Sequence, residues 1–236
     1  MSALVFKRPL MRSRLSEEVE RVLLKDIITG NIAVGEKLPT ERDLARSLEV
    51  NRSTVREALS RLESLDLVEI RHGDGVYVKS YLESGSLELI RAMIVLDSKR
   101  RDEILTGLLE FRTIVGPDMA SKAAIYRTDE QLSAMREIIE PSNGLDMMEK
   151  DIRMHHLIAL ASRNVLYLTL LNFFNKFVSE YGYLYFNDQV NRDRSERFHR
   201  EIYLAIEKRD SGLAHEIMRD VLAYAQDAVA EKLNNV

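Results

Sequence analysis

The chain has 236 residues, of which 45% are hydrophobic and 31% are charged, and it contains no cysteine. This is the composition of a soluble globular protein, and the length suffices for two ordinary domains, each with its own core. The lack of cysteine excludes disulfides, thiolate catalysis and cysteine-ligated zinc, so any metal would need His, Asp or Glu ligands.

The net charge of −4 is spread unevenly along the chain. Residues 1–80 carry 14 Lys and Arg against 13 Asp and Glu, whereas the remainder carries 20 against 25. A nucleic-acid-binding surface would therefore need its cations gathered on one face. No apolar run reaches membrane-spanning length, and basic residues interrupt the apolar ones near the N-terminus. We therefore expect a cytoplasmic protein with no membrane partner.

Two helices are predicted in the first 50 residues. Residues 15–29, LSEEVERVLLKDIIT, repeat apolar positions at the spacing of one buried helical stripe, and Gly30 ends the pattern. Thr40 then stands at an N-cap position, with Glu41 in the first turn and Leu44 on the inward face of a second helix.

A third helix is predicted to begin near Arg52, after the short turn EVN. Its core positions, spaced at i, i+4 and i+7, are Val55, Leu59 and Leu62. The segments LVEI and VYV then flank RHGDG, which indicates two short strands joined by a glycine turn. Helix, helix, short turn, helix and hairpin is the order of a winged helix-turn-helix, which we assign to residues 1–80.

The third predicted helix has a polar face suited to a DNA groove. Because its apolar residues are committed to the core, Arg52 and Arg56 project together from the opposite side. Ser53 and Thr54 lie in the first turn of this helix. The N-terminus of such a helix favours phosphate, and an arginine fork matches O6 and N7 of guanine.

Three further residues extend this face. Arg42, at the start of the second helix, is placed to brace the DNA backbone or to reach a base edge. His72 and Gly73, at the tip of the wing, are small and polar enough to follow a minor groove. The alternative is that the arginines form surface salt bridges with acidic neighbours at helical distances, namely Glu41, Asp43, Glu57 and Glu63.

The segments LPTERDLA, RSTVREAL and HGDGVYV resemble the DNA-binding domain of the GntR family of bacterial transcription regulators. The resemblance implies a winged helix-turn-helix that binds double-stranded operator DNA. It places the DNA-contacting positions on the same residues that the geometry favours, namely Arg42, Arg52, Ser53, Thr54, Arg56, His72 and Gly73.

The remainder of the chain reads as an all-helical domain over residues 86–236, after a linker at 80–86. No alternation typical of strands is found there, and Pro117 is expected to kink one of the helices. The predicted helices cover residues 86–97, 102–125, 129–140, 145–162, 164–186, 192–208 and 210–233.

Asp151 and His155 are four residues apart in DIRMHHLIALASRN and therefore share one helical face. His199 starts a later helix, and inside a bundle the three side chains could meet around a divalent metal. Such a pair is otherwise often only hydrogen-bonded within its helix. A metal-dependent hydrolase using these three residues is the alternative function, although no hydrolase motif accompanies them.

DIRMHHLIALASRN and FHREIYLAIEKRDSGLAHEIM resemble the all-helical ligand domain of the FadR-like branch of the same family. The resemblance implies a metal (Zn, Ni or Mn) held by one Asp and three His. Asp151, His155 and His199 fall on three of those positions, whereas the fourth falls on Val221, which cannot coordinate. The site is then three-liganded with water, completed by a neighbour such as Asp220, or lost.

Arg112 shares a helical stripe with apolar residues, so its guanidinium is aimed at apolar surroundings. A buried arginine must be paired. Either it forms an internal ion pair with a carboxylate such as Asp151, or it binds the carboxylate or phosphate of an effector. The resemblance favours the second role.

Aromatic residues crowd the segment FFNKFVSEYGYLYF at 173–186, either as core or as the lining of a pocket for a long apolar effector. The segment resembles the corresponding part of the fatty-acyl-CoA-responsive regulators of that branch. We expect a small organic acid or an acyl-type effector, bound by Arg112, Asn164, Phe173, Phe177 and Tyr181.

These observations together predict a ligand-responsive transcription regulator rather than an enzyme. Two subunits would bind a palindromic operator, because one helix reads only a few base pairs and two-fold symmetry doubles the contact. An effector in the helical domain would change the affinity for DNA. The sequence leaves open whether the protein is a repressor or an activator, and a third possibility is a helical adaptor whose winged domain binds protein.

Overall fold

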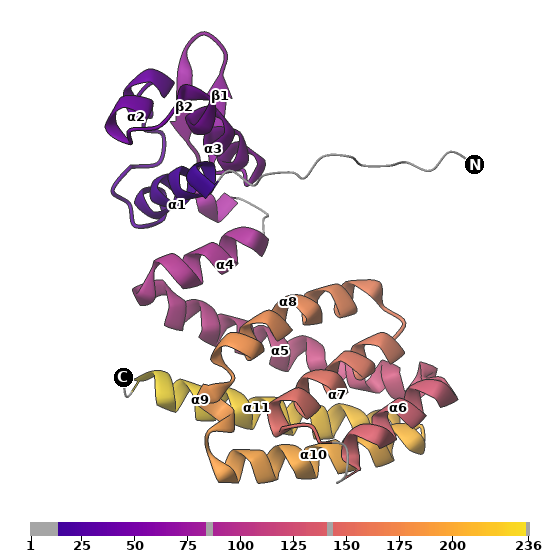
Figure 1. Cartoon of the computed structure of the whole chain (residues 1–236). Coiled ribbons are helices and arrows are strands. Elements are labelled where there is room, and N and C mark those ends of the chain that lie inside the picture. The colour runs from indigo at the N-terminus through magenta and orange to yellow at the C-terminus, as the bar shows by residue number, and fades with distance from the viewer. Residues whose placement is uncertain (1–13, 84–86, 141–143, 235–236) are drawn as a thin grey trace, which may run out of the picture. The chain divides into compact units, whose positions relative to one another are not determined.

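The computed structural model describes residues 14–83, 87–140 and 144–234, and the chain divides into two compact units, Met1–Arg101 and Asp102–Val236 (Figure 1). The described residues are mainly helical, with one two-stranded antiparallel sheet, which confirms the predicted fold class. None of the described helices is both long and apolar enough to cross a membrane. The predicted boundary at residues 80–86 stays a prediction.

The N-terminal unit is a three-helix core with a hairpin attached. Its elements are α1 (Arg14–Ile28), α2 (Glu41–Ser47), α3 (Arg52–Ser64), β1 (Val68–Arg71), β2 (Gly75–Val78), a 3-10 turn (Tyr81–Glu83) and α4 (Leu87–Leu96). The apolar stripe of α3 is fully buried and packs against α1 and α2, so the core contains Val55, Ala58, Leu59 and Leu62 together with Val19, Leu23, Ile27, Leu44 and Ala45. The opposite side of α3 is thereby left for solvent.

Local chemistry explains why α2 and α3 are short and closely spaced. The Thr40 hydroxyl accepts a hydrogen bond from the backbone N–H of Asp43 at 3.3 Å, which caps α2 as predicted. Glu49, in the turn between the two helices, adopts a left-handed φ of 54°. This reversal lets α3 start three residues later and cross α2 at the tight corner of a helix-turn-helix.

The hairpin runs antiparallel with Val68 opposite Val78 and Arg71 opposite Gly75. Gly73 adopts a φ of 79° in the connection, a conformation that glycine permits without strain. Lys37 adds an isolated bridge to Tyr77, so the segment before α2 lies along the outer strand. The predicted wing is therefore present, and it is tied to the loop that leads into α2.

The second unit is a helical bundle of α5 (Ser98–Tyr126), α6 (Asp129–Ile139), α7 (Met147–Ala161), α8 (Val165–Tyr181), α9 (Tyr183–Phe186), α10 (Gln189–Glu207) and α11 (Ser211–Asn234). Small residues let the helices approach closely, since many of the most buried positions are alanines, namely Ala120, Ala123, Ala124, Ala159, Ala161, Ala205 and Ala214. Gly116 allows the closest approach, because a Cβ atom there would lie 2.4 Å from Cδ1 of Leu222 on α11.

The structure corrects one predicted helix. Residues 164–186 do not form a single helix, because the chain breaks at Gly182 between α8 and α9. A Cβ atom on Gly182 would lie 2.4 Å from the carbonyl oxygen of Val178 and 2.8 Å from Sδ of Met148. The apolar pattern continues through both pieces, so periodicity alone could not place this break.

Candidate functional site

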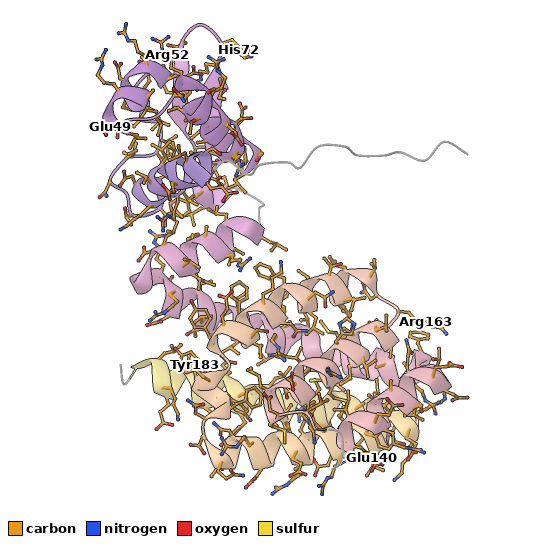
Figure 2. All side chains as sticks on the ribbon, viewed as in Figure 1. Glu49, Arg52, His72, Glu140, Arg163 and Tyr183 are labelled. Carbon is orange, nitrogen blue, oxygen red and sulfur yellow. The ribbon has the colours of Figure 1, made fainter. Side chains whose placement is uncertain are left out.

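The predicted DNA-contacting residues gather at one end of the N-terminal unit. Arg52 and Ser53 are exposed in the first turn of α3, and Thr54 behind them is half-buried. Figure 2 shows Arg52 and His72 projecting toward the same end of this unit, away from α1. Arg42 on α2 is exposed as well, with its Nε 3.8 Å from Oδ1 of Asp43. The face that the helix pattern predicted is therefore polar, exposed and arginine-rich.

One arginine of this face is held in a bidentate ion pair. Nε of Arg56 donates to Oε1 of Glu41 at 3.0 Å, and Nη2 donates to Oε2 at 2.7 Å. These hydrogen bonds, chiefly, lower the pKa of Glu41 and raise that of Arg56. The salt-bridge alternative thus holds for Arg56 with Glu41 and, at 3.8 Å, for Arg42 with Asp43. Among the described residues no such partner binds Arg52, and Glu63 accepts from the backbone N–H of Ile70 instead.

The wing is fastened by a cluster that sequence reasoning missed. Oδ1 of Asp74 accepts from Nζ of Lys37 at 2.8 Å, and Oδ2 accepts from the Tyr77 hydroxyl at 2.8 Å. The hydrogen bond from Lys37 is the main cause of the lowered pKa of Asp74. The guanidinium of Arg71 lies 4.2 Å from the centre of the Tyr77 ring. Asp74 thus fixes the turn that carries the exposed residues His72 and Gly73.

The helical unit contains a partly open cavity of about 100 Å³ between α5, α7, α8, α9, α10 and α11. Its walls are mostly apolar, and three of the residues predicted to bind an effector, Arg112, Phe177 and Tyr181, lie in them. Phe173 lies outside this lining and packs edge-on against Phe177, with 4.9 Å between ring centres. Asn164 also lies outside it, and its Oδ1 caps α8 by accepting from Leu166 N–H at 3.0 Å. Effector contact by the five residues stays a prediction.

One end of the cavity is polar. Asp151 and His155 of α7 meet His199 of α10, and all three side chains are buried. Oδ1 of Asp151 lies 3.2 Å from Nε2 of His199, and Oδ2 lies 3.6 Å from Nε2 of His155. The prediction that these three residues come together is therefore supported by the geometry. The ring of His155 also stacks on Phe198, with centres 5.3 Å apart.

The two titrating groups of this cluster differ in charge at neutral pH. Burial lowers the pKa of His155 to about 3, against the opposing attraction of Asp151, so its imidazole is neutral. Burial alone would raise the pKa of Asp151, but His155, His199 and Arg112 together outweigh it and lower the value to about 2. Asp151 is therefore a carboxylate held among hydrogen-bonding and cationic groups.

Arg112 lies on α5 and faces the same cavity. Burial lowers the pKa of its guanidinium, while the charge of Asp151 opposes that shift. Both oxygens of Asp151 face imidazoles, and no side chain of the described residues forms a hydrogen bond or ion pair with Arg112. The N–H groups of the guanidinium are therefore available to donate hydrogen bonds to a ligand, in a cavity whose wall is largely apolar.

A second polar group in the cavity was missed by sequence reasoning. The hydroxyl of Tyr185 on α9 is buried and has no hydrogen-bond partner within the described residues, although Ser195 lies beside it. Burial raises the pKa of Tyr185 to about 12, so it stays a neutral donor and acceptor. Nothing in the sequence separates Tyr185 from its aromatic neighbours, because only the break at Gly182 turns it inward.

The metal set implied by the sequence remains incomplete. Val221 lines the cavity and has no donor atom, while Asp220 is exposed and accepts hydrogen bonds from Arg219 at 3.1 Å. Over the described part of the chain, no three His, Asp or Glu side chains are grouped in a way that could hold a metal ion. Metal binding stays a prediction, and no step of the function below depends on it.

A winged helix-turn-helix with an arginine-rich reading face, followed by a helical domain, defines a DNA-binding regulator. Residues 15–78 match the family model described as bacterial regulatory proteins of the gntR family, and residues 79–231 match the model of the FadR C-terminal domain. The chain belongs to the GntR family of bacterial transcription regulators, in the branch that carries a FadR C-terminal domain. Neither matching model describes a hydrolase.

Similar proteins include a fatty acid metabolism regulator protein from Shewanella putrefaciens, which is 28% identical over 78% of this chain and 77% of its own length. The HTH-type transcriptional regulator Mce2R from Mycobacterium tuberculosis is 34% identical over 61% of this chain and 59% of its own. The solved structure of Lar, which controls expression of the Listeria monocytogenes agr system, matches with a TM-score of 0.57 and 19% identity, over 94% of this chain and 99% of its own. That last likeness concerns the fold alone.

Proposed function

We propose that this chain is an effector-controlled transcription regulator that binds a palindromic operator as a homodimer. The N-terminal face contacts the DNA through Arg42, Arg52, Ser53, Thr54, Arg56, His72 and Gly73. The cavity in the helical unit binds an amphipathic anion, which changes the affinity for DNA by favouring one arrangement of the regulator.

The observation that carries the effector proposal is the unpaired guanidinium of Arg112. The side chain is half-buried, and an anion that binds the guanidinium bidentately gains two charge-assisted hydrogen bonds. The rest of the cavity wall is largely aliphatic and aromatic, including Leu105, Phe174 and Phe177. The chemistry that fits is a carboxylate or phosphate on an apolar body, in agreement with the name of the Shewanella relative.

The polar end adds a second requirement. Asp151 and Tyr185 both line the cavity, and the Asp151 carboxylate is a charged acceptor. The negative charge of Asp151 repels an anionic ligand group. An anionic group of the effector therefore binds near Arg112, where it is kept away from Asp151 and can also accept a hydrogen bond from Tyr185. The cavity, at about 100 Å³, holds only a handful of water molecules, so an acyl chain needs it to widen.

Two measurements test the proposal. Selection of bound duplexes from random DNA should enrich a sequence with two-fold symmetry, and light scattering should give two chains on that duplex. A thermal-shift screen across small organic acids, fatty acids and acyl thioesters should raise the melting temperature for one class and change affinity for the selected duplex. Enrichment of no sequence, or no ligand that changes DNA affinity, would contradict it.

A further inference from the structure

Glu41 and Arg56 are joined across the corner of the helix-turn-helix, from the first residue of α2 to the second turn of α3. Both carboxylate oxygens are used, with contacts of 3.0 Å from Nε and 2.7 Å from Nη2. Yet the side chain of Arg56 remains 70% exposed. The pair therefore lies on the surface that faces DNA in the proposed function, and it has the geometry of the strongest kind of ion pair.

The way in which Glu41 binds Arg56 leaves one edge of the guanidinium free. A guanidinium has five N–H donors, and Glu41 takes only those of Nε and one of Nη2. Both donors of Nη1 and the second donor of Nη2 remain, and one N–H of Nη1 together with the remaining N–H of Nη2 forms the end-on fork. This is the fork that matches two acceptors of a guanine edge or of a phosphate.

Clamping also fixes the direction of that fork. A free exposed arginine samples many rotamers, and ordering it on binding costs conformational entropy. Glu41 fixes the rotamer before DNA arrives, as outer partners do at other recognition sites. Arg52, one turn earlier, has no such partner among the described residues. The two neighbouring arginines thus differ, because Arg52 has no ion-pair partner in the described part of the chain whereas Arg56 is held and locally neutralised by Glu41.

We propose that Glu41 is a positioning residue for sequence recognition, which holds Arg56 so that its end-on fork meets the DNA. This rests on the proposed function, in which the α3 face contacts DNA. The clamp persists in the complex, because release would leave a carboxylate facing phosphates. Because the pair carries no net charge, it weakens the attraction of the protein to any DNA. The fixed direction of the fork improves discrimination between sequences.

Two other roles of Glu41 lead to different measurements. If Glu41 masked Arg56 and competed with DNA, its removal would tighten binding to every duplex. If the pair merely braced α2 against α3, its removal would lower the melting temperature and weaken binding to every duplex alike. Positioning alone changes the ratio between a preferred and a scrambled duplex.

The test compares Glu41→Gln with Glu57→Gln. Glu57 lies on α3 beside Arg56 and pairs with Arg61 at 2.8 Å, so its replacement removes the same charge from another exposed ion pair. Arg61 keeps Glu20 at 3.4 Å as a second partner. The probes are the duplex that the wild-type protein selects from random DNA and a scrambled duplex of equal composition, with circular dichroism checking that each variant is folded.

For Glu41→Gln the ratio of the two affinities should fall about tenfold, because a misdirected fork loses much of one bidentate contact. Glu57→Gln should leave the ratio unchanged. The double variant Glu41→Gln/Arg56→Ala should be no less selective than Arg56→Ala alone, which also decides the matter if Glu41→Gln is less stable. An unchanged or increased ratio for Glu41→Gln, or equal losses on both duplexes, overturns the proposal. If the wild type selects no sequence, the proposed function itself fails.

Discussion

The guanidinium of Arg112 and the carboxylate of Asp151 line the same cavity without forming an ion pair. Nε2 of His155 and Nε2 of His199 lie 3.6 and 3.2 Å from the two carboxylate oxygens of Asp151. Arg112 is attracted to the same carboxylate only over a longer distance. The positive charge of Arg112 therefore has no directly bound carboxylate among the described residues. An anionic ligand supplies that partner.

Replacing Arg112 by Met should abolish the rise in melting temperature caused by the effector found in the screen. The stability of the ligand-free protein should change little, because a half-buried guanidinium without an ion-pair partner in the described part of the chain is exchanged for an apolar side chain of similar length. The loss in effector binding should be about 2–5 kcal/mol, measured by calorimetry. Arg153→Met, at an exposed position on α7, is the control. An effector response kept in full by Arg112→Met would contradict the assignment.

Stability should fall on acidification below pH 6.5, because of His155. The folded protein keeps this imidazole neutral down to about pH 3, whereas the unfolded chain protonates it near pH 6.5. The unfolded state then binds more protons, so the free energy of unfolding decreases by about 1.4 kcal/mol per pH unit in this window.

Asp151 adds to this loss only at lower pH, below its unfolded pKa near 3.8, because its folded pKa is about 2. Urea unfolding followed by circular dichroism in a chelating buffer measures the slope between pH 6 and pH 4. His155→Gln should flatten it, whereas His72→Gln, at the exposed wing, should keep it. An equal slope in wild type and His155→Gln would argue against a neutral buried His155.

Gly116→Ala should reduce the room for an effector. Its Cβ atom would lie 2.4 Å from Cδ1 of Leu222, and Leu222 lines the cavity, so the leucine must move or the helices must part. We expect a stability loss of about 1–3 kcal/mol and weaker effector binding.

Two variants serve as comparisons for Gly116→Ala. Gly107→Ala, on the same helix with nothing within 4 Å of its added Cβ, should raise stability by about 0.5–1 kcal/mol. Leu222→Val should restore much of what Gly116→Ala loses. Additive effects of Gly116→Ala and Leu222→Val would show that the two residues do not meet.

Val221→His tests the incomplete metal set directly. A histidine there would stand beside the cavity that holds Asp151 and His155, and it would supply the fourth ligand position. Titration with Zn²⁺, Ni²⁺ or Mn²⁺ should show tighter binding by Val221→His than by the wild type, with proton release. The same affinity in both proteins would indicate that the side chains around Asp151 do not converge on an ion.

Arg52→Ala should cost about 1–3 kcal/mol of binding to the selected duplex and relax the base preference at one position. The reason is that an exposed arginine in the first turn of α3 can donate hydrogen bonds to O6 and N7 of a guanine. Arg200→Ala, on the surface of the helical unit, should leave binding unchanged. Fluorescence anisotropy at several salt concentrations separates a base contact from a phosphate contact, since only the latter lowers the salt slope uniformly.

The sequence predicted most of the secondary structure, because the helices obey simple local rules. Thr40 caps α2 and the apolar stripe of α3 is buried as its spacing requires. The polar cluster of Asp151, His155 and His199 was also predicted, from the i,i+4 spacing of the first two residues and from the expected convergence of the helices in a bundle. Features that depend on long-range contacts were missed, such as the Asp74 cluster that fastens the wing.

The break at Gly182 is the clearest example of a feature that local sequence patterns do not predict. Glycine is tolerated within a helix, and the aromatic pattern runs on past it, so only the approach of Met148 and the Val178 carbonyl reveals the bend. That bend in turn decides that Tyr185 faces the cavity, whereas Asn164 stays at the far end of α8 as a cap. Long-range packing therefore selects which aromatic residues line the cavity.

The shortness of α9 has a consequence for how the cavity opens. With a single turn, α9 depends on α10 for its order, where Nδ2 of Asn191 donates to the Tyr185 carbonyl at 3.0 Å and Arg192 donates to the Phe186 carbonyl. Amide hydrogens of this turn should exchange with solvent sooner than those of α7 or α10, since one turn unravels without disturbing the bundle. We therefore expect the part of the cavity wall that contains Tyr185 to open first when a molecule enters the cavity.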